Sequence, residues 1–258
     1  MLFAHIPHWQ YLWLVMASTI AGVMNAMAGG GSFLSFPAML GVGVPPVQAN
    51  ATNTVALWPG QLTSVATLRG DVRKDLIPVV VLVSLLGGVS GAETLLHTSQ
   101  TTFLHMIPWL ILVGTVIFGI SGRLSKWVRS RATHHQQPHK IHSVWLALSL
   151  FPVCFYIGYF GAGGVFLVMT ILALFGIEEM HTLNAMKVVA AMSSNFCAIV
   201  TFVISGAVVW HYCLISAIFA GLGGWMGARF AKRMDGEVLR MFVVGTGLVI
   251  AAWFFWRR

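Results

Sequence analysis

The chain alternates between long apolar segments and short polar ones. Many apolar segments approach the roughly 20 residues that a helix needs to cross the hydrocarbon core of a bilayer. A transmembrane barrel would instead show short segments of alternating polarity. The pattern predicts an all-α polytopic membrane protein. Its expected helical segments cover residues 11–28, 32–43, 50–68, 76–96, 103–121, 143–160, 163–176, 184–204, 210–228 and 239–256.

The composition excludes a soluble globular domain. Hydrophobic residues make up 57% of the 258 residues and charged residues only 9%, whereas about 25% of the residues in a soluble domain are charged. The net charge of +8 could indicate nucleic-acid binding. However, the basic residues lie in short loops between apolar segments, which the positive-inside rule explains better. The first segment lacks a basic leader, so we expect no cleaved signal peptide.

Glycines interrupt one apolar stretch in each half of the chain. Residues 28–33 read Ala-Gly-Gly-Gly-Ser-Phe, and residues 161–166 read Gly-Ala-Gly-Gly-Val-Phe. Each glycine costs a helix about 1 kcal/mol, so both stretches should break it. In lipid such a break is tolerated only where it lines a cavity or is buried in protein. A broken segment in each half is the best sequence indication of a transporter's binding site. The small residues of 222–229 should instead allow close helix packing.

Basic residues concentrate in segment 123–142, which contains no acidic residue. We expect this segment to be a cytoplasmic linker between two membrane repeats, residues 1–122 and 143–258. Segments 97–102 and 205–209 contain no lysine or arginine and should be external.

The two repeats are expected to be inverted. Arg69, Arg73 and Lys74 should place the loop after the third segment inside, while the counterpart loop at 205–209 should be outside. Inversion requires an additional crossing or a re-entrant helix in each repeat. The short segments 32–43 and 163–176 can supply it, since about 12 residues rise only about 18 Å. This gives two repeats of about five helical segments. Joining each broken pair into one tilted span would instead give eight transmembrane helices.

Polar side chains inside apolar segments are candidates for a binding site. Lys187 lies in an apolar helix, where a lysine should face a cavity or a partner, unless it snorkels to the membrane surface. The pairs Asn50/Asn53 and Asn184/Lys187 each have the spacing that places two residues on one helix face. Amides, an ammonium and the N–H groups at a helix start can together bind an anion. The asparagines could instead join neighbouring helices.

Three stretches resemble the TauE/SafE family of sulfite and organosulfonate permeases. They are NAMAGGGSFLSFPAMLGVGVPPVQANATNTVALWPG at 25–60, the stretch from IGYFGAGGVFLVM to LNAMKVV at 157–189, and GGWMGARFAKRM at 223–234. The second stretch departs from the usual form, because Val165 stands where a further glycine is expected. The resemblance implies a carrier of small sulfur-containing anions, often an exporter, in the cytoplasmic (inner) membrane of a bacterium. The candidate substrate-binding residues are Gly29, Gly30, Gly31, Ser32, Asn50, Asn53, Gly163, Gly164, Asn184 and Lys187.

The main hypothesis is a secondary transporter with an anion site between the two broken helices, near the middle of the membrane. A passive anion channel is the alternative. An intramembrane enzyme is not expected, since no histidine or acid accompanies Lys187. We expect no cofactor and no metal, because the histidines at 134, 135, 139 and 142 match no metal-binding pattern. The expected partners are a small anion and the bilayer, with a proton as a candidate coupling ion. The oligomeric state is left open.

Overall fold

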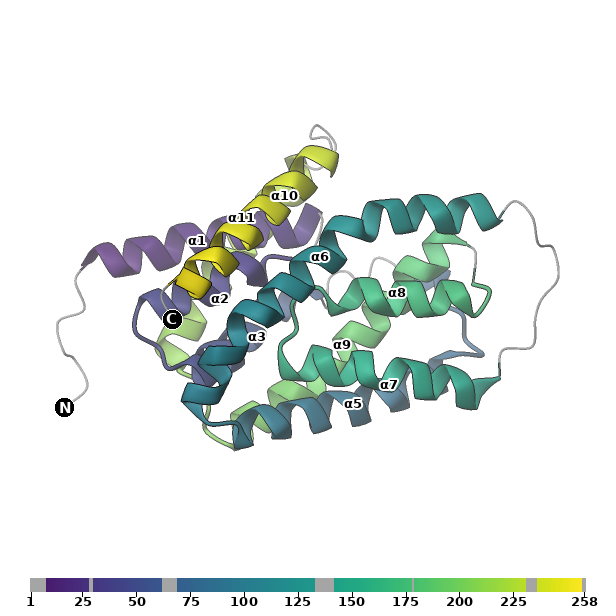
Figure 1. Cartoon of the computed structure of the whole chain (residues 1–258), viewed down its shortest axis with the longest axis horizontal. Coiled ribbons are helices and arrows are strands. Elements are labelled where there is room, and N and C mark those ends of the chain that lie inside the picture. Colours follow the sequence, from purple (N-terminus) through teal and green to yellow (C-terminus); the bar gives the residue numbers. More distant parts are fainter. Residues whose placement is uncertain are drawn as a thin grey trace. The chain divides into compact units, whose positions relative to one another are not determined.

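A computed structural model describes residues 8–27, 30–61, 69–132, 142–177, 179–230 and 236–256. These residues form α-helices and one 3₁₀ turn and contain no β-strand (Figure 1). The predicted all-α fold is confirmed. The elements are α1 (His8–Met27), α2 (Ser32–Gly41), α3 (Pro46–Leu57), η1 (Arg69–Asp71), α5 (Ile77–His97), α6 (Gln100–Ala132), α7 (Ser143–Tyr159), α8 (Gly164–Leu174), α9 (Met180–Ile204), α10 (Trp210–Phe230) and α11 (Gly236–Trp256).

Most helices begin and end close to the predicted segments, and α3 and α6 differ most. The segment expected at 50–68 contains a helix end at Leu57, and its residues 62–68 lie outside the described part of the chain. In α6 the apolar pattern ends at residue 121, but the helix continues through Ala132. Residues 123–132, the first part of the segment expected to be a linker, are therefore helical. Leucine, lysine and arginine are among the best helix formers, and the next proline is Pro138. A basic composition thus marked where the apolar segment ends but not where the helix ends.

Contacts divide the chain into two compact units, and each is described by itself. Unit 1 comprises residues 1–60, 96–115 and 202–258. Unit 2 comprises residues 61–95 and 116–201. Unit 1 therefore contains α1–α3, α10, α11 and the start of α6, while unit 2 contains α5, α7, α8 and most of α9. Each unit combines helices from both halves of the sequence. The expected division into repeats, and their inversion, stays a prediction.

Unit 1 is built on a close crossing of α1 and α10. A Cβ atom added to Gly22 would overlap the carbonyl group of Ala220, and one added to Gly223 would overlap that of Thr19. A Cβ on Gly227 would lie 2.9 Å from the Cα atom of Val23. Glycine allows two helix backbones to approach this closely in a membrane. The close-packing role expected for the stretch around Gly223 is thus confirmed.

Unit 2 contains a matching crossing of α5 and α7. A Cβ on Gly158 would overlap the carbonyl group of Gly88, and one on Gly91 would overlap that of Phe155. The spacing along each helix is the same as in unit 1. Thr19 and Gly22 correspond to Phe155 and Gly158, and Ala220 and Gly223 correspond to Gly88 and Gly91. In both units, the first helix of one half crosses a helix from the other half.

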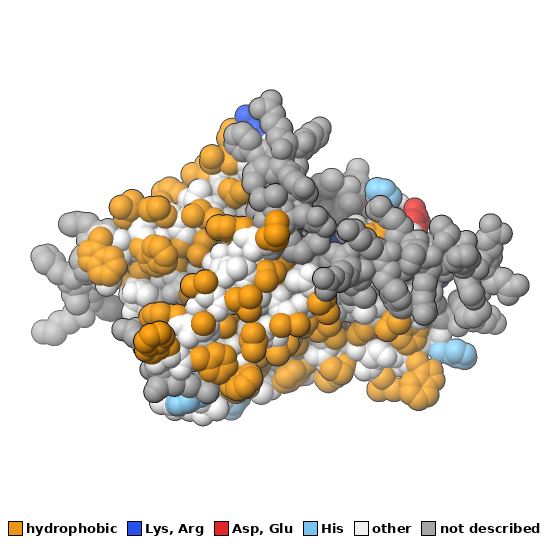
Figure 2. All heavy atoms as spheres, turned by 45° about the horizontal axis from the view of Figure 1, so that its top comes forward, with side chains coloured by type: hydrophobic (Ala, Val, Ile, Leu, Met, Phe, Trp, Pro, Cys, Tyr) orange, Lys and Arg blue, Asp and Glu red, His pale blue; other side chains and the backbone are white. Residues whose placement is uncertain are grey.

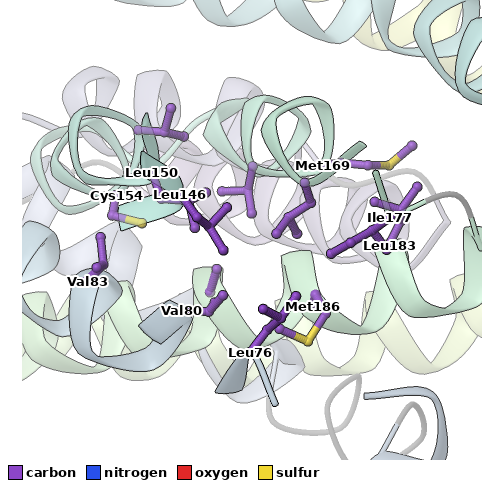
Figure 3. Packing of buried hydrophobic residues seen from close by; sticks show 14 of the residues in the cluster. Leu76, Val80, Val83, Leu146, Leu150, Cys154, Met169, Ile177, Leu183 and Met186 are labelled. Carbon is purple, nitrogen blue, oxygen red and sulfur yellow. The ribbon is translucent and has the colours of Figure 1, made fainter. Parts of the chain in front are cut away.

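The interior of unit 2 is a continuous hydrophobic cluster contributed by α5, α7, α8 and α9. Figure 3 shows its side chains directed toward one another. Buried apolar contacts between these helices hold α8 and α9 in place, and both carry candidate site residues. The cluster consists of Leu76, Val80, Val83, Leu146, Leu150, Val153, Cys154, Ile157, Val168, Met169, Leu172, Ile177, Leu183, Met186 and Ala190.

Large hydrophobic side chains also cover much of the exterior, as the face in Figure 2 shows. Trp9, Val144 and Ile204 are 63%, 70% and 81% exposed. Within the described residues, Ile77–His97, Gln100–Ile120 and Met180–Ile204 are long and apolar enough to cross a membrane. Exposed apolar surface on this scale is unusual for a soluble monomer and ordinary for a surface that faces lipid. The protein is a polytopic membrane protein.

Charged residues mark the loop before α5. Arg73 donates a hydrogen bond from Nε to Asp75 Oδ1 (3.1 Å) and pairs with Oδ2 through a second nitrogen. This hydrogen bonding lowers the pKa of the Asp75 carboxyl group. Both side chains are exposed, so the pair contributes little to stability.

The α1–α10 crossing predicts a sharp difference between two glycines of α10. Gly223→Ala should destabilise the protein by about 1–3 kcal/mol, because the added methyl group has no space beside Thr19. Gly221→Ala should cause no loss, since a Cβ there meets no other atom within 4 Å. Thermal unfolding in detergent micelles would measure both. Equal melting temperatures for the two variants would show that the crossing is not this tight.

Candidate functional site

The glycine break of unit 1 separates α1 from α2. Gly30 has φ +90°, a conformation that favours glycine. Gly31 precedes the first helical residue, Ser32, and a Cβ on it would overlap the carbonyl group of Ala21. The chain therefore turns back beside α1, and α2 is a separate helix that packs on α1. The α2 helix has ten residues, about half the length that crosses the hydrocarbon core. Gly29 lies outside the described residues.

A buried hydrogen-bond network joins this break to α3. Ser35 Oγ lies 2.5 Å from Asn53 Oδ1, to which it donates its one hydrogen, and 3.2 Å from the carbonyl oxygen of Gly31. Ser35 is fully buried and Asn53 is 2% exposed. In the described part of the chain, no hydrogen bond is formed by the Asn53 Nδ2 amide group, which has two donors. An amide donor thus lies close to the start of α2.

Neighbouring helices fix the position of α3. Gln100, at the start of α6, accepts a hydrogen bond from the backbone N–H of Val47 (2.9 Å) and donates one to Gln48 (2.8 Å). Thr52 Oγ1 accepts a hydrogen bond from the backbone N–H of Val209 (3.0 Å), just before α10. These contacts satisfy N–H groups at two helix starts, which would otherwise lack partners. They also hold the helix that carries Asn50, which is 1% exposed.

The glycine break of unit 2 separates α7 from α8. Gly161 and Gly163 both have φ +80°, and α8 begins at Gly164. A Cβ on Gly164 would lie 2.6 Å from Ile157 Cγ1 of α7. The Tyr156 hydroxyl donates a hydrogen bond to the carbonyl oxygen of Ala162 (2.9 Å), so one carbonyl group of the break is satisfied. The break forms although Val165 replaces the glycine expected there.

Lys187 of unit 2 lies on α9 and faces an aromatic ring of α8. Its Nζ atom is 5.3 Å from the centroid of the Phe166 ring. Among the described residues, no carboxylate forms an ion pair with it. Asn184 lies one turn earlier on α9, and both side chains are partly buried. The structure thus gives Lys187 an aromatic partner on α8.

The structure thus groups the sequence-predicted residues by unit. Gly30, Gly31, Ser32, Asn50 and Asn53 belong to unit 1, and Gly163, Gly164, Asn184 and Lys187 belong to unit 2. The expectation that both groups bind one shared anion stays a prediction. Sequence reasoning missed Ser35, whose only signal is its position four residues after Gly31.

No group of three or more metal-binding side chains occurs within the described residues. His134, His135 and His139 lie outside them. His142 is exposed.

The apolar exterior and the two glycine-broken helices define a polytopic membrane transporter. The chain belongs to the sulfite exporter TauE/SafE family, whose family model matches residues 14–254. This confirms the resemblance inferred from the glycine and asparagine motifs.

Several curated proteins are similar along nearly their whole length. Probable membrane transporter protein ORF9 of Sinorhizobium sp. is 28% identical over 92% of this chain and 89% of its own. Probable membrane transporter protein YfcA of Escherichia coli K12 is 24% identical over 93% of this chain and 87% of its own. A probable membrane transporter protein of Haemophilus influenzae is 25% identical over 90% and 89%. No solved structure matches the chain significantly.

The Ser35–Asn53 hydrogen bond predicts a cost for removing the Ser35 hydroxyl group. Ser35→Ala would leave a buried amide oxygen unpaired and should destabilise the protein by about 1–3 kcal/mol. Thr54→Val on α3 is the matched control. The Thr54 hydroxyl group only donates to a carbonyl oxygen of its own helix (2.9 Å), and its loss should change little. Thermal unfolding in detergent compares the two, and equal effects would contradict the proposed network.

Proposed function

We propose that this protein is a secondary transporter of small sulfur-containing anions, such as sulfite or organosulfonates. The family name supports the substrate class, and the names of the relatives support transport in place of catalysis. The proposed location is the cytoplasmic membrane of a bacterium, with segment 123–142 on the cytoplasmic side because of its basic residues.

The observation that carries the proposal is the position of Lys187 in the membrane helix α9. An ionised lysine in an apolar helix is costly and is typically retained for a function. Here no carboxylate in the described part of the chain neutralises it, so an anion is the missing partner. An ammonium group offers three donors, and the three oxygens of sulfite or a sulfonate are matching acceptors. Asn184 lies on the same helix face and can add amide donors to the same anion.

Unit 1 supports anion binding through different groups. The α2 helix begins at Ser32, and no side chain caps its N-terminus. The N–H groups of Phe33, Leu34 and Ser35 already donate to the carbonyl groups of Gly30 and Gly31, so the support for an anion here is the partial positive charge of the helix start. The amide group of Asn53 lies near this end of the helix, since it is joined to Ser35 in the first turn of α2. Unit 1 thus offers neutral donors, whereas unit 2 offers a full positive charge.

A flux assay tests the proposed transport. Purified protein in liposomes should move sulfite and short sulfonates faster than empty vesicles do, with saturation at high substrate. Lys187→Met should lower this flux about tenfold to a hundredfold, as expected for the loss of charge-assisted hydrogen bonds. Lys74→Met, in an exposed loop, should have no effect.

The same assay separates the alternatives. Current that grows linearly with voltage without saturating would indicate a passive anion channel. Repeating the flux with and without a proton gradient identifies proton coupling. Flux no faster than in empty vesicles under any of these conditions would refute the proposed substrate class.

The asparagines should affect affinity more than turnover. Asn50→Ala and Asn184→Ala each remove neutral amide donors and should raise the apparent KM about two- to tenfold. Asn195→Ala is the control. Asn195 is not among the candidate site residues, and its amide group donates to Gln61 Oε1 (3.0 Å). An unchanged KM in both test variants, with the protein stably folded, would remove these asparagines from the site.

A further inference from the structure

The neighbour of the Lys187 charge on α8 is the face of a single aromatic ring. Lys187 Nζ lies 5.3 Å from the centroid of Phe166, within the range of a cation–π contact. The negative face of the ring partly compensates the charge in an otherwise apolar helix. A ring face is only a weak hydrogen-bond acceptor. Among the described residues, no other group accepts a hydrogen bond from the ammonium group of Lys187.

The Phe166 ring contacts a second aromatic ring and lies in the first turn of α8. Phe118 of α6 packs edge-on against it, with ring centroids 5.1 Å apart and an interplanar angle of 83°. Phe118 is itself 1% exposed. The backbone N–H of Phe166 donates to the carbonyl oxygen of Gly163 (3.2 Å), so the residue belongs to the first turn after the glycine break. The ring therefore connects the broken end of α8 to the charge on α9.

We propose that Phe166 is a displaceable cover on Lys187, which occupies the ammonium group when no anion is bound. Charge-assisted hydrogen bonds to an oxyanion are stronger than a cation–π contact, so an arriving anion displaces the ring. When the anion leaves, the ring returns and again stabilises the charge. Phe166 is thus an access-controlling residue of the site. This inference rests on the proposed function, in which Lys187 binds the transported anion.

Lysine acetylation tests the cover without requiring transport. Acetic anhydride reacts with the unprotonated amine, and mass spectrometry reports the rate for each lysine of the protein in nanodiscs. Phe166→Leu uncovers Nζ and removes a contact that favours its charged form. Both effects should raise the rate at Lys187, roughly two- to fivefold for a partly exposed cation–π contact. The rate at the exposed Lys74 should not change.

Two further variants separate a cover from a general packing effect. Phe166→Tyr keeps the ring and should retain the wild-type rate at Lys187. Phe175→Leu makes the same substitution as the test variant just after the last residue of α8, where Phe175 packs against the hydrophobic cluster, and should also retain it. A rate increase in Phe175→Leu equal to that in Phe166→Leu would overturn the proposal.

Ethanesulfonate supplies the anion in the final comparison. It should protect Lys187 from acetylation in the wild type, and it should do so at a roughly two- to fivefold lower concentration in Phe166→Leu, because the ring no longer competes. Equal rates at Lys187 in the wild type and Phe166→Leu overturn the cover, whatever the anion does. A raised rate without protection by ethanesulfonate instead overturns the anion assignment on which displacement depends.

Discussion

A backbone that leaves its helix inside a membrane must find new partners for the N–H and C=O groups it exposes. The rest of this structure depends on how the two glycine stretches meet that requirement. Each break is enclosed by protein: Gly31 lies against the backbone of Ala21, and the Tyr156 hydroxyl bonds to the carbonyl group of Ala162. At the first break, the carbonyl groups of Gly30 and Gly31 accept hydrogen bonds from N–H groups in the first turn of α2. Both breaks also create helix starts, whose partial positive charge suits an anion.

The two units use this arrangement with different chemistry. In unit 1 the polar partner of the broken helix is Asn53, a neutral side chain bonded to Ser35. In unit 2 it is Lys187, whose charge lies against Phe166. The glycines of the α1–α10 and α5–α7 crossings have the same spacing in both units. Similar frameworks therefore carry one neutral and one charged set of donors, which allows the two sets to evolve separately.

The sequence predicted the helical segments well, because a long apolar stretch in a membrane protein must be helical and a run of glycines must interrupt it. It did not predict the end of α6, since basic helix formers resemble a linker in composition. The sequence also did not reveal which helix Gly223 contacts. A glycine in a membrane helix indicates a close approach of a second helix but does not identify that helix. Ser35 and Phe166 were missed for a similar reason. A serine or a phenylalanine in an apolar helix is ordinary, and only tertiary contacts reveal what each one touches.

Each unit takes one crossing helix from the other half of the chain, and this affects how the protein is made. During synthesis α1 enters the membrane long before α10 exists, so the glycine face around Gly22 has no permanent partner until most of the chain has been translated. Until then that face of α1 lacks the helix it packs against in the complete protein. The interleaved order thus ties the completion of unit 1 to the end of translation.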